Sequence, residues 1–393
     1  MTKSDGKKRI TIIGTGLIGG SIGLALKAAG LNGIEIVGHD RERGVDNQAE
    51  RKGAIDRAEH NLPRAVQGAA MVIIATPVLA VREVMEQIAP DLEEGAVVTD
   101  TASTKAHVMQ WARELLPPHV SFVGGHPMAG KETAGIEHAE ATLFRGKAYC
   151  VCPAVDAPDT AIKSVLGLAQ IAGAEPMFLD PEEHDVYAAA VSHLPLMVST
   201  ALFHLLRSSP AWPDMGLMAS SGFRDVTRLA SGDPQLSHDI WVTNREAVIH
   251  WLDRMASELQ GFRDLLQDAK DETLLATFAR AQMERESFLS QPPRRKPVAA
   301  TETPDAGNAL MDLLVGGMVA ERMRKIQKLP ELMNEARSQA DAEPAGQPGA
   351  PQKKRGPSLA ERIAEGVRRD LEKMEQKRAR EEANKGDSER REE

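Results

Sequence analysis

Residues 10–28 have the sequence ITIIGTGLIGGSIGLALKA, in which a short β-branched run leads through closely spaced glycines into a leucine- and alanine-rich segment. The run at 10–13 is typical of a buried strand, and the segment from Leu17 onward is typical of a helix. Gly14, Gly16 and Gly19 match the G-x-G-x-x-G pattern, and the strand before it and the helix after it are the context that this pattern requires. The stretch therefore predicts the first strand, turn and helix of a dinucleotide-binding fold.

The three glycines have separate physical tasks in such a turn. Gly14 permits the tight turn, Gly16 lets the backbone approach a pyrophosphate, and Gly19 lets the helix pack closely on the strand. The free N–H groups at the helix N-terminus, at Leu17 and Ile18, then face the phosphate charge. The alternative is a glycine-rich turn that binds no ligand.

The dinucleotide that we expect is NAD. Asp40 ends the second predicted strand, where an acidic side chain accepts hydrogen bonds from the adenosine ribose hydroxyls and so favours NAD over NADP. Arg41 and Arg43 follow directly and could meet a 2′-phosphate, so NADP stays open as an alternative.

The chain divides into three regions, of which the first spans residues 1–180. Short β-branched runs alternate there with helix-like segments, which predicts an α/β, Rossmann-like domain with a doubly wound parallel sheet. Thr76 and Pro77 follow one of these runs, at the sheet edge where a dinucleotide lies. The strand candidates are 10–13, 34–37, 71–75, 97–100, 120–124, 148–152 and 175–179, and the helix candidate before the last of them is 160–171.

The second and third regions lack the alternation of β-branched runs and helix-like segments that marks the first region. Residues 181–291 contain no convincing strand, and apolar residues recur at three- and four-residue spacing in 183–206, 239–266 and 271–289, which predicts an all-α domain that lines the substrate pocket and forms a subunit interface. Residues 292–393 open with a proline- and arginine-rich linker, continue with one amphipathic segment at 308–336, and end in mixed Lys, Arg and Glu. This composition predicts a charged, partly disordered extension whose partner is unknown.

The totals exclude several classes of protein. With 393 residues, 42% hydrophobic residues and a net charge of −9, the chain is an ordinary acidic protein with two cores and no basic field for nucleic acid. Its two cysteines, Cys150 and Cys152, indicate core residues rather than a disulfide framework or a metal site. Glycines interrupt the apolar run near the N-terminus, which excludes a secretory signal, and no apolar stretch approaches the roughly 20 residues of a membrane helix. We therefore expect a cytoplasmic protein.

Polar residues follow two further strand candidates. The sequences are DTASTK at 100–105 and GGHPMAGKE at 124–132, and both should converge on the cofactor edge of the sheet. The imidazole of His126 can take a proton from a substrate alcohol while hydride leaves the same carbon, and the hydroxyl of Ser103 can hold the ring in the required tautomer. The alternative for His126 is a loop histidine bonded to the backbone.

These segments, together with SHLP at 192–195 and GFRDVTRLA at 222–230, resemble the prephenate/arogenate dehydrogenase family. The resemblance runs in order from about residue 9 to 290, and the HPMAG and FRDxTR elements are specific to it. It implies NAD-dependent oxidative decarboxylation of prephenate, or of arogenate, in a homodimer formed by the helical domains. It further implies that His126 is the catalytic acceptor, that Ser103 contacts both His126 and the substrate, that Arg228 pairs with a substrate carboxylate, and that His193 lines the pocket.

Other interpretations remain beside this one. Leu196 stands where the family often has histidine, which leaves the preference for prephenate over arogenate open. Without the family match, Arg228 reads as a surface ion-pair residue and His193 as a buried core histidine. A β-hydroxyacid dehydrogenase would share the glycine pattern and the helical domain, although a catalytic lysine would be expected on its helical domain. A nucleotide-sensing scaffold that binds a partner through the tail would have no need for Ser103, His126 and Arg228 together.

Overall fold

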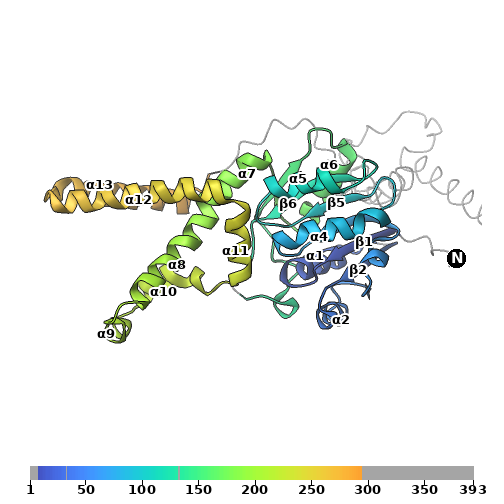
Figure 1. The fold of residues 1–393 in the computed structure, drawn as a ribbon, viewed down its shortest axis with the longest axis horizontal. Coiled ribbons are helices and arrows are strands. Elements are labelled where there is room, and N and C mark those ends of the chain that lie inside the picture. The colour runs from blue at the N-terminus through green and yellow to red at the C-terminus, as the bar shows by residue number, and fades with distance from the viewer. Residues whose placement is uncertain (1–7, 32, 132, 294–393) are drawn as a thin grey trace, which may run out of the picture. The chain divides into compact units, whose positions relative to one another are not determined.

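The computed structural model describes residues 8–31, 33–131 and 133–293, and its N-terminal part is built on one eight-stranded sheet (Figure 1). The strands are β1 (Lys8–Ile13), β2 (Ile34–His39), β3 (Arg57–Ala58), β4 (Ala69–Ile74), β5 (Val97–Asp100), β6 (Ser121–Pro127), β7 (Ala148–Pro153) and β8 (Glu175–Phe178). Their order across the sheet is β3-β2-β1-β4-β5-β6-β7-β8. The chain therefore changes direction of winding between β1 and β4, the point at which open α/β sheets bind ligands.

The doubly wound parallel sheet is confirmed from β1 to β6, whereas β7 runs antiparallel to β6. The connection from β6 to β7 contains only a short 3₁₀ turn, η2 (Ile136–His138), and no crossover helix, so the chain returns beside the strand that it has just left. A full helix, α6 (Asp159–Ile171), then connects β7 to β8, and this pair is again parallel. The two-residue strand β3 was not predicted, because it is too short to show a sequence pattern.

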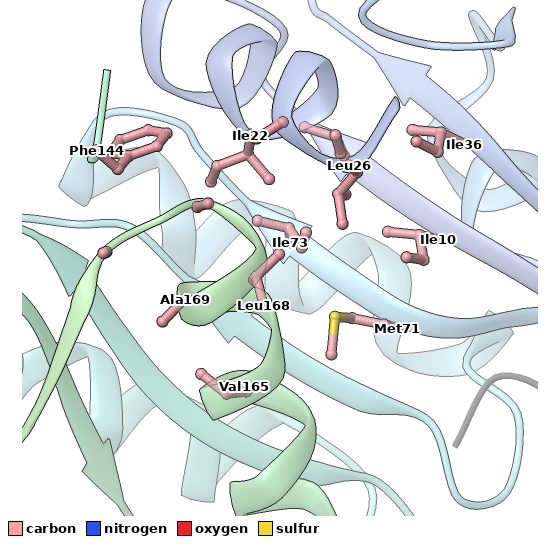
Figure 2. Close-up of a cluster of buried hydrophobic side chains, with 14 of the residues drawn as sticks. Ile10, Ile22, Leu26, Ile36, Met71, Ile73, Phe144, Val165, Leu168 and Ala169 are labelled. Atoms are coloured by element: carbon pink, nitrogen blue, oxygen red, sulfur yellow. The ribbon is translucent and has the colours of Figure 1, made fainter. Parts of the chain in front are cut away.

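Helices cover both faces of the sheet. Alternate side chains of β1 enter different hydrophobic clusters: Ile10 and Ile12 pack with residues of α1 and α6 (Figure 2), while Ile13 packs with residues of α3, α4 and α5. Each fully buried isoleucine or leucine in these clusters contributes about 1.5–3 kcal/mol of transfer free energy. The helices are α1 (Leu17–Ala28), α2 (Arg43–Arg51), α3 (Leu62–Val66), α4 (Val78–Ile88), with the 3₁₀ turn η1 (Ala89–Asp91), and α5 (Ala106–Leu115).

From Pro181 onward the described chain is helical, as predicted. The predicted segment 239–266 is not one helix, because Asn244 leaves the helical conformation with φ −132° and ψ 36° and separates α11 from α12. Between α7 and α8 the backbone forms a single π turn, η3, a feature that is frequent at functional sites. The elements are α7 (Pro181–Ala188), η3 (Ala189–His193), α8 (Leu194–Arg207), α9 (Trp212–Leu217), α10 (Ser221–Thr227), η4 (Arg228–Ser231), α11 (Pro234–Thr243), α12 (Arg245–Gln267) and α13 (Asp271–Ser290).

One continuous helical run corrects the expectation about apolar length. Pro181–Arg207 has 27 residues, and its most apolar 18-residue window has a mean hydropathy of 1.5, which by length and composition alone suffices to cross a membrane. Only 22% of its most apolar window is buried, and Val191, Phe203 and Leu205 are exposed. The run also carries buried polar side chains, described below, that hydrogen-bond to the nucleotide-binding part. The predicted extension at 292–393, including the segment 308–336, lies outside the described residues from position 294 onward.

Candidate active site

The glycine-rich turn connects β1 to α1 at the switch point of the sheet. Gly14 has a φ of +88°, and a Cβ at this position would lie 2.4 Å from the carbonyl oxygen of Ala75. A Cβ on Gly19 would lie 1.9 Å from the carbonyl oxygen of Gly14, whereas a Cβ on Gly16 would have no neighbour within 4 Å. Gly16 therefore borders open space at the N-terminus of α1, which no side chain caps. This open space and the free N–H groups of the first helical turn fit a pyrophosphate.

Asp40 follows β2 and fixes this turn from the opposite side. Its Oδ2 accepts a hydrogen bond from the backbone N–H of Thr15 at 2.8 Å, and its Oδ1 accepts one from Glu42 at 3.1 Å. Oδ2 also accepts a hydrogen bond from Thr15 Oγ1 at 3.4 Å, whereas Oδ1 keeps a further lone pair, and the side chain is half-buried. Asp40 is therefore held in place and can still accept hydrogen bonds from ribose hydroxyls.

The other predicted nucleotide-binding residues lie around the same turn. Thr76 and Pro77 connect β4 to α4, and the Cγ2 atom of Thr76 would lie 3.2 Å from a Cβ on Gly14. Arg41 and Arg43 are exposed beside Asp40. Together these residues fit a dinucleotide, with the arginines on the side where a 2′-phosphate would be met.

A fully buried ion pair connects the end of β5 to β6. Lys105 Nζ donates to Asp100 Oδ2, which also accepts the N–H of Ala102 at 2.9 Å. Asp100 Oδ1 accepts the N–H of Gly125 at 3.0 Å. Removing one partner of a buried pair costs about 3–5 kcal/mol, because the other charge is left uncompensated. The pair therefore fixes the loop 101–105 against the strand that carries His126.

His126 lies inside β6 and not in a loop, which corrects the sequence-based expectation. The predicted strand ended at Gly124, but β7 pairs with β6 beyond that point and places His126 opposite Cys150. Gly125 looked like a loop residue, yet a Cβ on it would lie 2.5 Å from the carbonyl oxygen of Asp100. The glycine allows close approach of the backbone, and the imidazole projects from a rigid strand with only 7% of its surface exposed.

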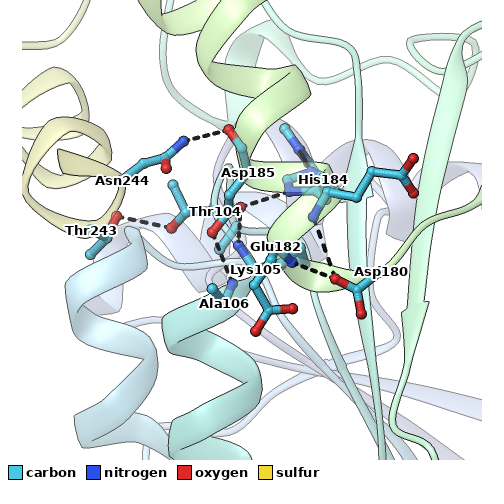
Figure 3. A network of polar contacts seen from close by, with 12 residues as sticks. Thr104, Lys105, Ala106, Asp180, Glu182, His184, Asp185, Thr243 and Asn244 are labelled. Atoms are coloured by element: carbon cyan, nitrogen blue, oxygen red, sulfur yellow. Dashed lines mark hydrogen bonds and ion pairs between the residues drawn. The ribbon is translucent and has the colours of Figure 1, made fainter. Parts of the chain in front are cut away.

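The hydrogen-bond partner of His126 is a second buried histidine, which α7 supplies. Nδ1 of His126 lies 2.8 Å from Nε2 of His184, and Nδ1 of His184 lies 2.8 Å from Oδ1 of Asp185. The Asp185 carboxylate also accepts the backbone N–H groups of Lys105 at 2.7 Å and of Ala106 at 2.9 Å (Figure 3). A chain of hydrogen bonds therefore runs from the start of α5 to the candidate catalytic base.

Asn244 orients another histidine in the same cluster, His193. Its Nδ2 donates to the carbonyl oxygen of Asp185 at 2.7 Å and faces Nδ1 of His193 at 3.2 Å. Because the amide N–H₂ only donates, His193 Nδ1 accepts and the ring proton lies on Nε2. His193 has no exposed surface, and its Nε2 has no hydrogen-bond partner among residues 8–31, 33–131 and 133–293. This buried, unused donor is suited to a polar group of a ligand.

Burial keeps the imidazoles of His126 and His193 neutral. It lowers the pKa of His126 well below the ordinary value, and positive charge on His184, Lys105 or His193 lowers it further. Burial also lowers the pKa of His193 to about 4, against an opposing effect of Asp185. At neutral pH His126 therefore has a lone pair with which it can accept a proton.

The depressed pKa of His193 predicts a loss of stability in acid. The unfolded chain takes up a proton on this residue near pH 6.5 and the folded chain only near pH 4. The contribution of the neutral His193 to the free energy of unfolding is therefore present above pH 6.5 and is lost as the pH falls toward 4. The pKa values of the unfolded and folded states differ by about 2.5, which corresponds to a loss on the order of 3 kcal/mol in the free energy of unfolding. Urea unfolding at pH 7 and pH 4.5 should show that His193→Gln loses about 2–3 kcal/mol less than the wild type. Equal losses in the two proteins would contradict this account.

Cys150 and Cys152 are buried free thiols in β7, and the prediction that they are core residues is confirmed. Burial raises the pKa of both, to about 12 for Cys152, so the thiols stay protonated. Within the described ranges no group of three or more His, Cys, Asp or Glu residues is arranged to hold a metal ion.

The other predicted site residues occupy separate elements. Ser103 is half-buried between β5 and α5, and the Nδ1 partner of His126 is His184 where we expected Ser103. Arg228 begins η4 with an exposed side chain, and Leu196 is half-buried in α8. η4 packs on α8, where the N–H of Ala230 donates to the buried Oγ of Ser199 at 3.1 Å. The substrate contacts of Ser103 and Arg228 stay predictions.

The sequence analysis did not select His184, Asp185 and Asn244. The first two follow Pro-Glu-Glu at the start of α7, and this stretch was interpreted only as a favourable first helical turn. A histidine and an aspartate side by side at the beginning of an apolar helix were the available signal. Asn244 could not be selected, because the predicted helix ran through it.

Comparison with known proteins adds independent observations. The family model for the prephenate dehydrogenase nucleotide-binding domain matches residues 22–177, and the model for the prephenate dehydrogenase dimerization domain matches residues 180–280. A prephenate dehydrogenase from Bacillus subtilis is 34% identical over 284 residues, which are 72% of this chain and 76% of that protein.

Two solved structures are similar over both regions. The prephenate dehydrogenase from A. aeolicus, in complex with hydroxyphenyl propionate and NAD+, is 29% identical with a TM-score of 0.67, and the match covers 73% of this chain and 100% of that one. The arogenate dehydrogenase from Synechocystis is 28% identical with a TM-score of 0.62, and the match covers 71% of this chain and 99% of that one.

Proposed function

Because this chain belongs to the prephenate dehydrogenase family, we propose that it converts prephenate to 4-hydroxyphenylpyruvate with NAD and releases carbon dioxide, a reaction of tyrosine biosynthesis. The observation that carries the proposal is the buried, neutral imidazole of His126, which is hydrogen-bonded through Nδ1 and therefore offers Nε2 to a substrate hydroxyl. His126 lies within β6, the strand next to β5, in the same parallel set of strands that carries the glycine-rich turn.

For this reaction the protein needs mainly to orient substrate and cofactor and to supply one proton acceptor. When bound, NAD takes a hydride from the ring carbon that bears the 4-hydroxyl. Nε2 of His126 accepts the hydroxyl proton; as the ring carboxylate leaves as carbon dioxide, its bonding electrons complete the aromatic ring and the proton returns to the ring oxygen. Prephenate and NAD thus give 4-hydroxyphenylpyruvate, carbon dioxide and NADH without net proton release. Aromatisation drives the reaction, so positioning is the main task of the chain.

The residues around the glycine-rich turn would hold NAD. Gly16 leaves the space for the pyrophosphate, the first N–H groups of α1 face its charge, and Asp40 accepts from the ribose hydroxyls. The placement of Asp40 favours NAD over NADP, in agreement with the bound NAD+ of the A. aeolicus relative.

Polar groups from the helical domain would hold the substrate. The guanidinium of Arg228 suits a substrate carboxylate, and the buried Nε2–H of His193 suits a substrate oxygen. Ser103 would contact the substrate hydroxyl from the loop after β5. The hydroxyphenyl propionate in the A. aeolicus structure, a phenol with a carboxylate side chain, supports a pocket for this class of molecule.

The helical domain would also form a homodimer. Large apolar side chains are exposed on several of its helices, among them Phe203, Ile249, Leu259 and Phe278. Such surface is normally buried against a partner. The match to a dimerization domain supports a second copy of this chain as that partner. We propose the cytoplasm as the location, because the similar prephenate dehydrogenases are biosynthetic enzymes.

The test is the rate of NAD reduction with prephenate and with arogenate in parallel, together with carbon dioxide release. We expect prephenate to be used with a kcat/KM about tenfold or more above that of arogenate. A preference for arogenate would correct the substrate and keep the reaction class, whereas turnover of small 3-hydroxyacids alone would indicate a β-hydroxyacid dehydrogenase. Normal NAD binding without turnover of any of them would overturn the proposal.

A further inference from the structure

We propose that His184 and Asp185 are positioning residues that hold His126 in the tautomer with its proton on Nδ1, so that Nε2 is always available as the acceptor. The inference rests on the proposed function in one respect, namely that His126 accepts the substrate proton. Its geometric part, the tautomer, stands on the hydrogen bonds alone.

The assignment starts from groups that can only donate. The backbone N–H of Lys105 points at Asp185 Oδ1, and that of Ala106 points at Oδ2, so both carboxylate oxygens are acceptors. Nδ1 of His184, 2.8 Å from the same Oδ1, must therefore carry a hydrogen.

The remaining protons follow from this one. A neutral imidazole with hydrogen on Nδ1 has only a lone pair on Nε2, so His184 Nε2 accepts. The atom that faces it at 2.8 Å is Nδ1 of His126, which must be the donor. In a neutral ring this leaves Nε2 of His126 unprotonated. Because the carboxylate fixes the first proton, it also fixes the last one, two side chains away.

With His184 neutral, burial excludes the opposite arrangement. If His126 carried its proton on Nε2, two lone pairs would face each other at 2.8 Å, in a site where His184 is 1% and His126 is 7% exposed. Water cannot satisfy either nitrogen there, and buried acceptors without donors are strongly unfavourable.

The same chain stabilises the reaction once the proton has moved. The His126 imidazolium keeps its Nδ1–H bond to His184, and the negative charge of Asp185 lies behind that ring. The other charged pair nearby, Asp100 with Lys105, is already neutralised internally. Cys150 of β7 and His193 of η3 also face the site. Burial raises the pKa of Cys150 and lowers that of His193, so both are uncharged at neutral pH. Asp185 is thus the carboxylate whose hydrogen bonds lead to the acceptor.

A purely structural role for Asp185, as a cap for α5, is the competing account, and the tautomer itself separates the two. Nitrogen-15 NMR of the full chain with labelled histidine, without ligands, reports which ring nitrogen of His126 is protonated. We expect Nδ1–H in the wild type and a shift to Nε2–H in His184→Leu. In His184→Gln, Asp185 should hold the amide N–H₂ and turn the amide oxygen to His126, which preserves the Nδ1–H form.

Turnover should follow the tautomer. His184→Leu should lower kcat by about 10²-fold, the lower end of what a general base contributes, and His184→Gln should recover most of that loss. Affinity for NAD and KM for prephenate should stay within about threefold. His238→Leu is the matched control, because His238 also pairs through Nδ1 with the aspartate that follows it, at 3.3 Å, but is 63% exposed.

The outcomes separate this inference from the proposed function. Wild-type protein with His126 in the Nε2–H form would overturn the inference whatever the activity. His184→Leu with unchanged tautomer and kcat would do the same, and if that variant does not fold, the wild-type tautomer and the Gln variant decide. Nδ1–H in a wild type that turns over no tested substrate would support the positioning role and overturn the proposed function.

Discussion

His126→Asn is expected to lower kcat with prephenate by about 10²–10⁴-fold, the range that a positioned general base contributes. Asparagine is close to histidine in size and can still hydrogen-bond to His184, but it cannot hold a proton at neutral pH. The imidazole projects from a strand, 7% exposed, so the fold and the glycine-rich turn should be unaffected.

Steady-state kinetics and NAD titration check this result together. NAD affinity should stay within about threefold of the wild type, and His238→Asn, a change at an exposed histidine, should keep full activity. A His126→Asn enzyme that retains more than about one tenth of the wild-type kcat would show that another group accepts the proton.

Gly16→Val is expected to abolish NAD binding without unfolding the protein. No atom lies within 4 Å of the position of a new Cβ, so the fold should accommodate the side chain, at a cost of about 1 kcal/mol or less for a poor residue at the start of α1. The same open space is where the pyrophosphate would lie. The Kd for NAD should therefore rise on the order of 10²-fold or more, which is about 2.7 kcal/mol.

Gly19→Val is the matched contrast, because its Cβ would lie 1.9 Å from the carbonyl oxygen of Gly14. It should lower Tm by about 10 °C or more, whereas Gly16→Val should shift Tm by only a few degrees. Thermal unfolding and NAD titration of the two variants distinguish them. Normal NAD affinity in folded Gly16→Val would mean that the cofactor does not lie over this turn.

The elements that the sequence predicted well are those whose signals are local. The glycines at 14, 16 and 19 occupy the turn that their pattern predicts, and the apolar runs of β1, β4 and β5 form strands within one or two residues of their expected bounds. Periodicity and turn chemistry act over a few residues, so one sequence can show them.

The parts that were missed depend on contacts between distant segments. β6 extends through His126 only because β7 pairs with it from the opposite direction, and no residue near His126 encodes that pairing. The role of Asp185 arises where α7 meets the start of α5, 79 and 80 residues earlier in the chain. Ser103 was expected to orient the imidazole because it belonged to a motif, whereas His184 belonged to none.

Asp185 has two functions: it accepts two backbone N–H groups at the start of α5, and it accepts the Nδ1–H of His184. Together these functions restrict which residues can occupy position 185. As the acceptor for two N–H groups at the start of α5 it could be replaced by the other residues that cap helices, serine, threonine or asparagine. A hydroxyl offers a single oxygen for three donors, and an asparagine must turn an N–H₂ group toward one of them. Glutamate keeps the charge but is one methylene longer than the 2.7–2.9 Å contacts allow. Either requirement alone tolerates several residues, and the two together leave aspartate.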